Sequence, residues 1–136
     1  MNGTVLIVED EALVALTMEE VLTDAGYVVC GVADTPDSAL ELARLHEPEI
    51  AVVDVRLAAG GDGIVLAALL AAMGPISILF ATGNCADVRK RARAGQGCLS
   101  KPFQAGWLLA ALEAVQTGQP AEIPGFFSLP FERAPA

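Results

Sequence analysis

Short apolar runs alternate along this chain with longer segments in which apolar residues recur every three or four positions. The short runs are predicted strands and lie at residues 5–8, 27–32, 50–53, 76–81 and 98–100. The longer segments are predicted helices and lie at residues 14–25, 36–47, 64–70, 86–94 and 105–116. Alternating strands and helices are typical of an α/β fold with a parallel sheet. We therefore predict a doubly wound (βα)5 sandwich with strand order 2-1-3-4-5.

Polar residues stand where four of these strands end. Glu9 and Asp10 follow the first strand, Asp54 follows the third, Thr82 ends the fourth and Lys101 follows the fifth. The carboxyl ends of parallel strands meet at one edge of a sheet, so these groups are expected to lie together. Each residue alone is also typical of an ordinary polar surface. Their combination at successive strand ends favours a site.

Three carboxylates at one edge predict a Mg²⁺ site, because Mg²⁺ prefers hard oxygen ligands and takes only a few of them from protein. Asp10 and Asp54 are the expected direct ligands. Glu9 is expected to act through a water molecule, and the backbone carbonyl of Arg56 to supply a further oxygen.

Asp54 is also a candidate nucleophile toward a phosphoryl group, because phosphoryl transfer depends on positioning and on cations that offset charge. In that chemistry Lys101 would neutralise phosphoryl oxygens, and Thr82 would donate a hydrogen bond to one of them. The Lys101–Pro102 bond is a candidate for the cis form, which occurs almost only before proline.

Composition indicates one domain. The chain has 136 residues, of which 54% are hydrophobic and 5% aromatic, so the core is expected to be aliphatic. No apolar run is long enough to cross a bilayer, and the N-terminus lacks the pattern of a secretory signal. The three cysteines, Cys30, Cys85 and Cys98, are scattered and odd in number. Reduced thiols in a cytoplasmic protein are the simplest interpretation.

The charge balance opposes direct DNA binding, because such binding depends on Lys and Arg neutralising phosphates. The formal net charge is -9, and half of the eight Lys and Arg residues fall within residues 89–93. A solvated helix face is favoured for this basic segment over a docking patch for an acidic partner.

Four motifs follow one another along the chain and read "VLIVEDE", "AVVDVRL", "FATGN" and "LSKPF". In this order they resemble the CheY-like receiver domain of two-component response regulators, and the resemblance covers about residues 3–117. The combination is highly specific.

The resemblance implies a flavodoxin-like fold and a role for each site residue. Asp54 would accept a phosphoryl group from a phosphohistidine, Glu9 and Asp10 would form the acidic Mg²⁺ pocket, Thr82 would be the switch hydroxyl, and Lys101 would be the lysine of the site. It further implies a signalling phosphoacceptor with slow autodephosphorylation, not an enzyme.

Departures from the family pattern favour a subgroup. Cys98 stands three positions before the lysine, where the family usually has an aromatic switch residue, so no rotating ring can report phosphorylation there. The loop at residues 57–63 is slightly long and lacks the usual proline. With residues 80–84 it resembles the FAT GUY subgroup of single-domain and stress-response regulators of alphaproteobacteria, although Cys85 replaces that motif's tyrosine. We hypothesise that motion of the loop after Thr82, made easier by Gly83, replaces the ring.

Residues 1–118 are the predicted receiver domain and residues 119–136 a tail, with no output domain expected. Residues 118–136 hold four of the eight prolines and three of the five phenylalanines, Phe126, Phe127 and Phe131. Disordered segments are poor in aromatics, so the tail is expected to dock on the domain or on a second copy.

The predicted function is phosphoryl transfer to Asp54 from a sensor histidine kinase or a histidine phosphotransfer domain, followed by binding of an unknown downstream protein. Leu13 and Leu16 are candidate exposed contacts for the kinase. One alternative is a phosphohydrolase of the haloacid dehalogenase type, but that family typically has a second acid where this chain has Arg56. The other is an interaction module that works without phosphorylation.

Overall fold

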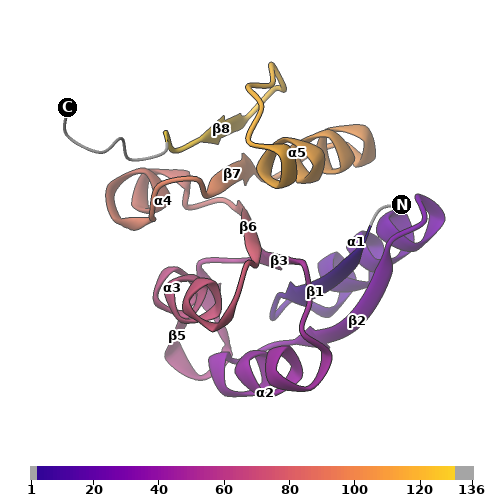
Figure 1. The fold of residues 1–136 in the computed structure, drawn as a ribbon, viewed down its shortest axis with the longest axis vertical. Coiled ribbons are helices and arrows are strands. Elements are labelled where there is room, and N and C mark those ends of the chain that lie inside the picture. The colour runs from indigo at the N-terminus through magenta and orange to yellow at the C-terminus, as the bar shows by residue number, and fades with distance from the viewer. Residues whose placement is uncertain (1–2, 131–136) are drawn as a thin grey trace.

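The computed structural model describes residues 3–130, in which a six-stranded sheet has helices on both faces (Figure 1). The strands of this sheet are β1 (Thr4–Val8), β2 (Val28–Ala33), β3 (Ile50–Val53), β6 (Ser77–Thr82), β7 (Gly97–Ser100) and β8 (Phe126–Ser128). The helices are α1 (Ala12–Asp24), α2 (Pro36–His46), α3 (Gly63–Met73), α4 (Cys85–Arg91) and α5 (Ala105–Thr117). The first two residues of the predicted domain and Phe131 of the predicted tail lie outside the described range.

The strands are ordered β2-β1-β3-β6-β7-β8. The first five in that order are parallel, which confirms the doubly wound sandwich and its 2-1-3-4-5 order. The sheet as a whole is mixed, because β8 adds a sixth strand that was not predicted and that runs antiparallel to β7. An edge strand leaves N–H and C=O groups unpaired, and the chain beyond α5 returns to pair those of β7.

Apolar side chains form two cores, one on each face of the sheet. Helices α1 and α5 cover one face, with Leu22 and Leu112 packed in the same core as Val52. Helices α2, α3 and α4 cover the other, with Leu66 in the core that contains Phe80. The central strands are buried on both faces, which explains why they read as continuous apolar runs. Among residues 3–130, none of the helices is long and apolar enough to cross a membrane.

Helix boundaries follow local capping signals. Thr35 accepts a hydrogen bond from Ser38 N at 3.2 Å at the start of α2, and Asp62 accepts bonds from the first turn of α3. The helix predicted at 86–94 is shorter at its end, since α4 stops at Arg91. The next residue, Ala92, is extended, and Gly95 has a φ of 84°, so the chain turns there toward β7.

The loop after Asp54 is a small hairpin of β4 (Arg56–Leu57) and β5 (Gly61–Asp62). The hairpin brings residue 63 back beside residue 55, where Gly63 N donates to Val55 O at 2.6 Å. A Cβ at Gly63 would lie 1.8 Å from the Asp54 carbonyl oxygen, so only glycine fits there. This contact holds the segment that carries Asp54 against the start of α3.

Candidate functional site

The sheet places the acidic residues side by side. Strands β1 and β3 are parallel neighbours in which Val8 pairs with Val53, so Glu9 and Asp54 follow adjacent strand ends. Asp54 N donates to Val8 O at 2.9 Å, which extends the ladder by one residue. The predicted proximity of the acidic pair to Asp54 is therefore present in the structure.

Glu9, Asp10 and Asp54 form one cluster. Each offers a carboxylate oxygen, and these atoms all lie within 4.8 Å of one another. Glu9 and Asp54 are buried, whereas Asp10 is exposed. Three hard oxygen donors open to solvent on one side fit Mg²⁺, which keeps several of its waters when bound to protein.

Lys101 reaches the same cluster from the end of β7. Its Nζ lies 2.5 Å from Glu9 Oε1 and 2.9 Å from Asp54 Oδ2. The backbone N–H of Lys101 donates to Thr82 O at 3.0 Å, which holds the lysine beside the end of β6. The Lys101–Pro102 bond is cis, as predicted.

Thr82 is fully buried at the end of β6. Its hydroxyl accepts a hydrogen bond from Asn84 N at 3.1 Å and also bonds to Asp54. Thr82 therefore connects the acidic cluster to the loop that leads into α4.

The two buried carboxyls differ in pKa. Burial raises the pKa of Glu9 to about 7, although its hydrogen bond with Lys101 opposes the rise. Burial would also raise the pKa of Asp54, but hydrogen bonds from Lys101, Thr82 and Val55 N outweigh it and leave that pKa below its usual value. The same two acids raise the pKa of Lys101 against the effect of burial. Asp54 is thus the carboxyl that the site keeps ionised.

Arg56 opens β4, two residues after Asp54, and its side chain is exposed. That its backbone carbonyl binds the metal remains a prediction.

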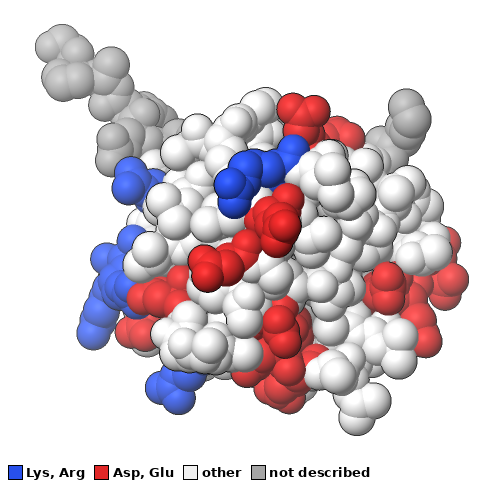
Figure 2. Space-filling model, turned by 90° about the horizontal axis from the view of Figure 1, so that it is seen from below, with Lys and Arg blue, Asp and Glu red and all other residues white. Residues whose placement is uncertain are grey.

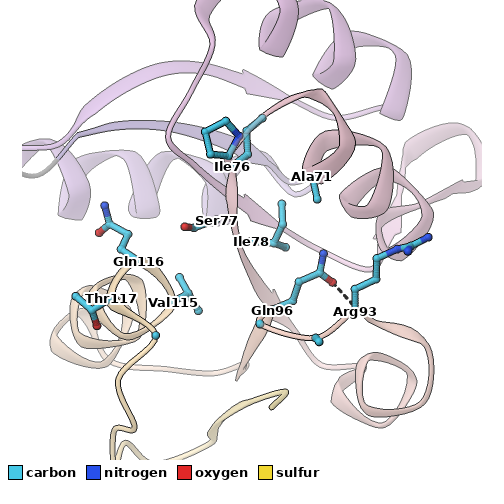
Figure 3. A pocket seen from close by; sticks show the side chains of 13 residues that line it. Ala71, Ile76, Ser77, Ile78, Arg93, Gln96, Val115, Gln116 and Thr117 are labelled. Atoms are coloured by element: carbon cyan, nitrogen blue, oxygen red, sulfur yellow. Dashed lines mark hydrogen bonds between the residues drawn. The ribbon is translucent and has the colours of Figure 1, made fainter. Parts of the chain in front are cut away.

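A hollow of about 490 Å³ lies at the other end of the strands, where β6 and β7 begin (Figure 3). Among the described residues that line it, Arg93 is the one charged side chain, and there is no carboxylate, thiol or imidazole. Gln96 accepts a hydrogen bond from Arg93 N at 3.0 Å at its rim. The ionisable groups capable of chemistry are therefore at the acidic edge, not in this hollow.

The profile of the response regulator receiver domain matches residues 5–113. The chain belongs to this family. It is 38% identical over 113 residues to the transcriptional regulatory protein PdtaR of Mycobacterium tuberculosis, covering 80% of this chain and 54% of that relative. It is 30% identical over 118 residues to the chemotaxis protein CheY of Thermotoga maritima, covering 85% of this chain and 98% of that relative.

Solved receiver structures share the fold. The crystal structure of the response regulator PhyR from Brucella abortus matches with a TM-score of 0.75 and 27% identity, over 85% of this chain and 48% of PhyR. The chain spans about half the length of PdtaR and PhyR. Receiver domains are signalling phosphoacceptors that bind Mg²⁺ at an acidic pocket and are generally not enzymes. The predicted family is confirmed, and the FAT GUY subgroup stays a prediction.

Sequence reasoning missed two contacts near the receiver site. The sulfurs of Cys85 and Cys98 lie 2.6 Å apart, and Phe127 of the tail lies opposite Cys98. The signal for the first was that Cys98 stands where the family usually has an aromatic residue and Cys85 stands where the FAT GUY motif has its tyrosine. Nothing in the tail sequence indicated which strand it would pair with.

Proposed function

We propose that this receiver domain accepts a phosphoryl group on Asp54 from the phosphohistidine of a sensor histidine kinase or a histidine phosphotransfer domain. The observation that carries the proposal is Asp54 itself, a nearly buried carboxylate bonded to Lys101 and Thr82 and clustered with two further acids. An ordinary surface aspartate is solvated and is not held among partners of this kind.

The chain's own groups account for each part of the transfer. An Asp54 oxygen forms a bond to phosphorus as the bond from phosphorus to the donor histidine nitrogen breaks. The Lys101 ammonium offsets charge on the phosphoryl oxygens, and the Thr82 hydroxyl donates to one of them. Glu9, Asp10, Asp54 and the Arg56 carbonyl would hold Mg²⁺, which when bound neutralises charge on the transferring group.

The proposed output is binding of a downstream protein, with the receiver domain acting in the manner of a FAT GUY regulator. The exposed Leu13 and Leu16 of α1 support docking of the phosphoryl donor beside the site. The net charge of -9 supports a protein partner instead of DNA. A cytoplasmic location follows from a kinase partner and belongs to the same proposal.

Incubation with Mg²⁺ and acetyl phosphate, followed by intact mass, tests the proposal. We expect one phosphoryl adduct on the wild type and on Asp24→Asn, whose exposed carboxyl lies at the end of α1. Asp54→Asn should show no adduct, and chelation of Mg²⁺ should prevent the wild-type adduct.

Other outcomes point elsewhere. Turnover of phosphate esters without an adduct would support the phosphohydrolase alternative. If neither an adduct nor turnover is observed, the result would support an interaction module that works without phosphorylation. An adduct that persists in Asp54→Asn would place the acceptor on a different residue.

A further inference from the structure

Two thiols meet between α4 and β7. Cys85 is the first residue of α4 and Cys98 lies within β7, and their sulfurs are 2.6 Å apart although 13 positions separate them in the sequence. Both are free thiols in the structure. The cysteine at the family's usual aromatic position and the cysteine at the tyrosine position of the FAT GUY motif are thus in direct contact.

The two thiols differ in access. Cys98 is fully buried in the core beneath α4, with Phe127 of β8 opposite it across the strand pair. Cys85 is half-buried at the helix start, where its sulfur also contacts Thr82 O at 3.7 Å. An oxidant arriving from solvent therefore reaches Cys85 first, and Cys98 lies directly behind it.

The third cysteine cannot compete within the same chain. Cys30 lies on β2, and three strands separate β2 from β7 in the sheet. Strand spacing puts the two strands about 19 Å apart. A disulfide within one chain therefore has one available pairing.

We infer that Cys85 and Cys98 are an oxidation site that forms a reversible disulfide when the chain meets hydrogen peroxide. Transient disulfides that sense oxidants are the usual exception to reduced cysteines in cytoplasmic proteins. Disulfide formation itself does not depend on the proposed phosphoryl transfer.

The reaction takes two balanced steps. The Cys85 sulfur attacks one peroxide oxygen and the O–O bond breaks, which gives a sulfenic acid on Cys85 and one water carrying the thiol proton. The Cys98 sulfur then attacks the Cys85 sulfur, the S–O bond breaks, and the hydroxyl leaves with the Cys98 proton as a second water. Two thiols are oxidised and one peroxide is reduced. Burial raises the pKa of Cys98, so little of it is thiolate and it is not the first thiol to react; its contact with Cys85 places it for the second step.

The cross-link would act on the segment that the phosphoryl state is proposed to move. Asn84 N bonds to the Thr82 hydroxyl, and Cys85 follows directly, so a bond from Cys85 to β7 ties this loop to the sheet. Oxidation should therefore restrict the response of residues 83–91 to phosphorylation. This consequence rests on the proposed function.

The test treats the reduced full chain with hydrogen peroxide, then unfolds it in urea and blocks free thiols with N-ethylmaleimide, so that the buried Cys98 is also accessible to the reagent. We expect intact mass to show the loss of two hydrogens and one maleimide adduct, on Cys30, with all three cysteines alkylated after treatment with dithiothreitol. A digest should contain the Cys85–Cys98 peptide pair. Cys30→Ser is the matched control and should form the same disulfide, whereas Cys85→Ser and Cys98→Ser should not.

Three maleimide adducts on the peroxide-treated wild type would overturn the inference, as would a disulfide that needs Cys30. A second measurement follows amide chemical shifts of residues 83–91 with acetyl phosphate and Mg²⁺, before and after oxidation. Shifts that shrink on oxidation support the coupling, and equal shifts refute it. If no phosphoryl adduct forms in either redox state, the proposed function fails while the disulfide result stands.

Discussion

At the scale of residues, Glu9 is the group whose ionisation the fold opposes. Its side chain is fully buried beside Asp54 and Asp10, with Lys101 as the one cation bonded to it among the described residues. Lys101 is shared with Asp54, so one ammonium faces several carboxylates. Without a metal, repulsion among these acids is a cost to the folded state.

This cost predicts how stability depends on pH in the metal-free chain. The pKa of Glu9 rises from 4.5 to about 7 on folding, so between these values the folded chain binds more protons than the unfolded one. The free energy of unfolding should therefore fall as pH rises through this window, by about 1–3 kcal/mol. The lowered pKa of Asp54 changes the free energy of unfolding at more acidic pH, and the raised pKa of Lys101 changes it at more basic pH. Urea unfolding in EDTA across the window measures the slope.

Glu9→Gln removes the ionisation and should flatten this slope. Glu20→Gln, an exposed acid on α1, should leave it unchanged. A slope of equal size in Glu9→Gln would show that other groups cause it.

At the scale of elements, β8 completes the edge of the sheet. Its neighbouring residues face opposite cores, with Phe126 packed against the α1 and α5 side and Phe127 against the α4 side. Phe127 also lies 3.9 Å from the Arg89 guanidinium, measured from the ring centroid. Part of the basic segment of α4 therefore contacts an aromatic ring, a favourable arrangement for a cation.

Phe126→Ala and Phe127→Ala should each lower the free energy of unfolding by about 1–3 kcal/mol, because both rings are half-buried and large-to-small changes cost apolar contact. Deleting residues 120–136 should cost more than either substitution and should promote self-association through the exposed β7 edge. Ser128→Ala, at the exposed end of β8, is the matched control. Urea unfolding and size-exclusion chromatography measure both effects. Unchanged stability in all variants would mean that β8 pairing adds nothing.

At the scale of the whole molecule, charge is unevenly distributed. Figure 2 shows acidic side chains spread over one face and basic side chains gathered mainly toward the side where α4 lies in Figure 1. The net charge of -9 means that any added salt screens repulsion, in addition to whatever a specific cation does. A test of Mg²⁺ must separate these two effects.

Mg²⁺ at 100 times its dissociation constant should stabilise the folded chain by about 2.7 kcal/mol, because only the folded chain presents the carboxylate cluster. NaCl at matched ionic strength should give less. Asp54→Asn should bring the Mg²⁺ effect down to the NaCl level, while Asp24→Asn should retain it. Thermal unfolding followed by circular dichroism measures the shift, and equal stabilisation by both salts would argue against the site.

Much of the fold and of the candidate site followed from residues next to each other in the chain. The apolar runs predicted the five parallel strands, since strands covered on both faces need continuous apolar side chains. The positions of Asp54 and Lys101 at strand ends predicted that both lie at one edge of the sheet, because parallel topology brings those ends together.

Tertiary structure alone decided the contacts between segments whose sequences carry no pairing signal. The three-residue β8 is too short for a periodic pattern, and its partner was set by the unpaired edge of β7. The contact of Cys85 with Cys98 depends on how α4 packs on β7, which no local spacing encodes. The sequence by itself therefore determined the doubly wound order and its acidic edge, because short-range patterns encode strands and their ends. The contact between the two thiols and the pairing of β8 with β7 depended instead on how distant segments pack.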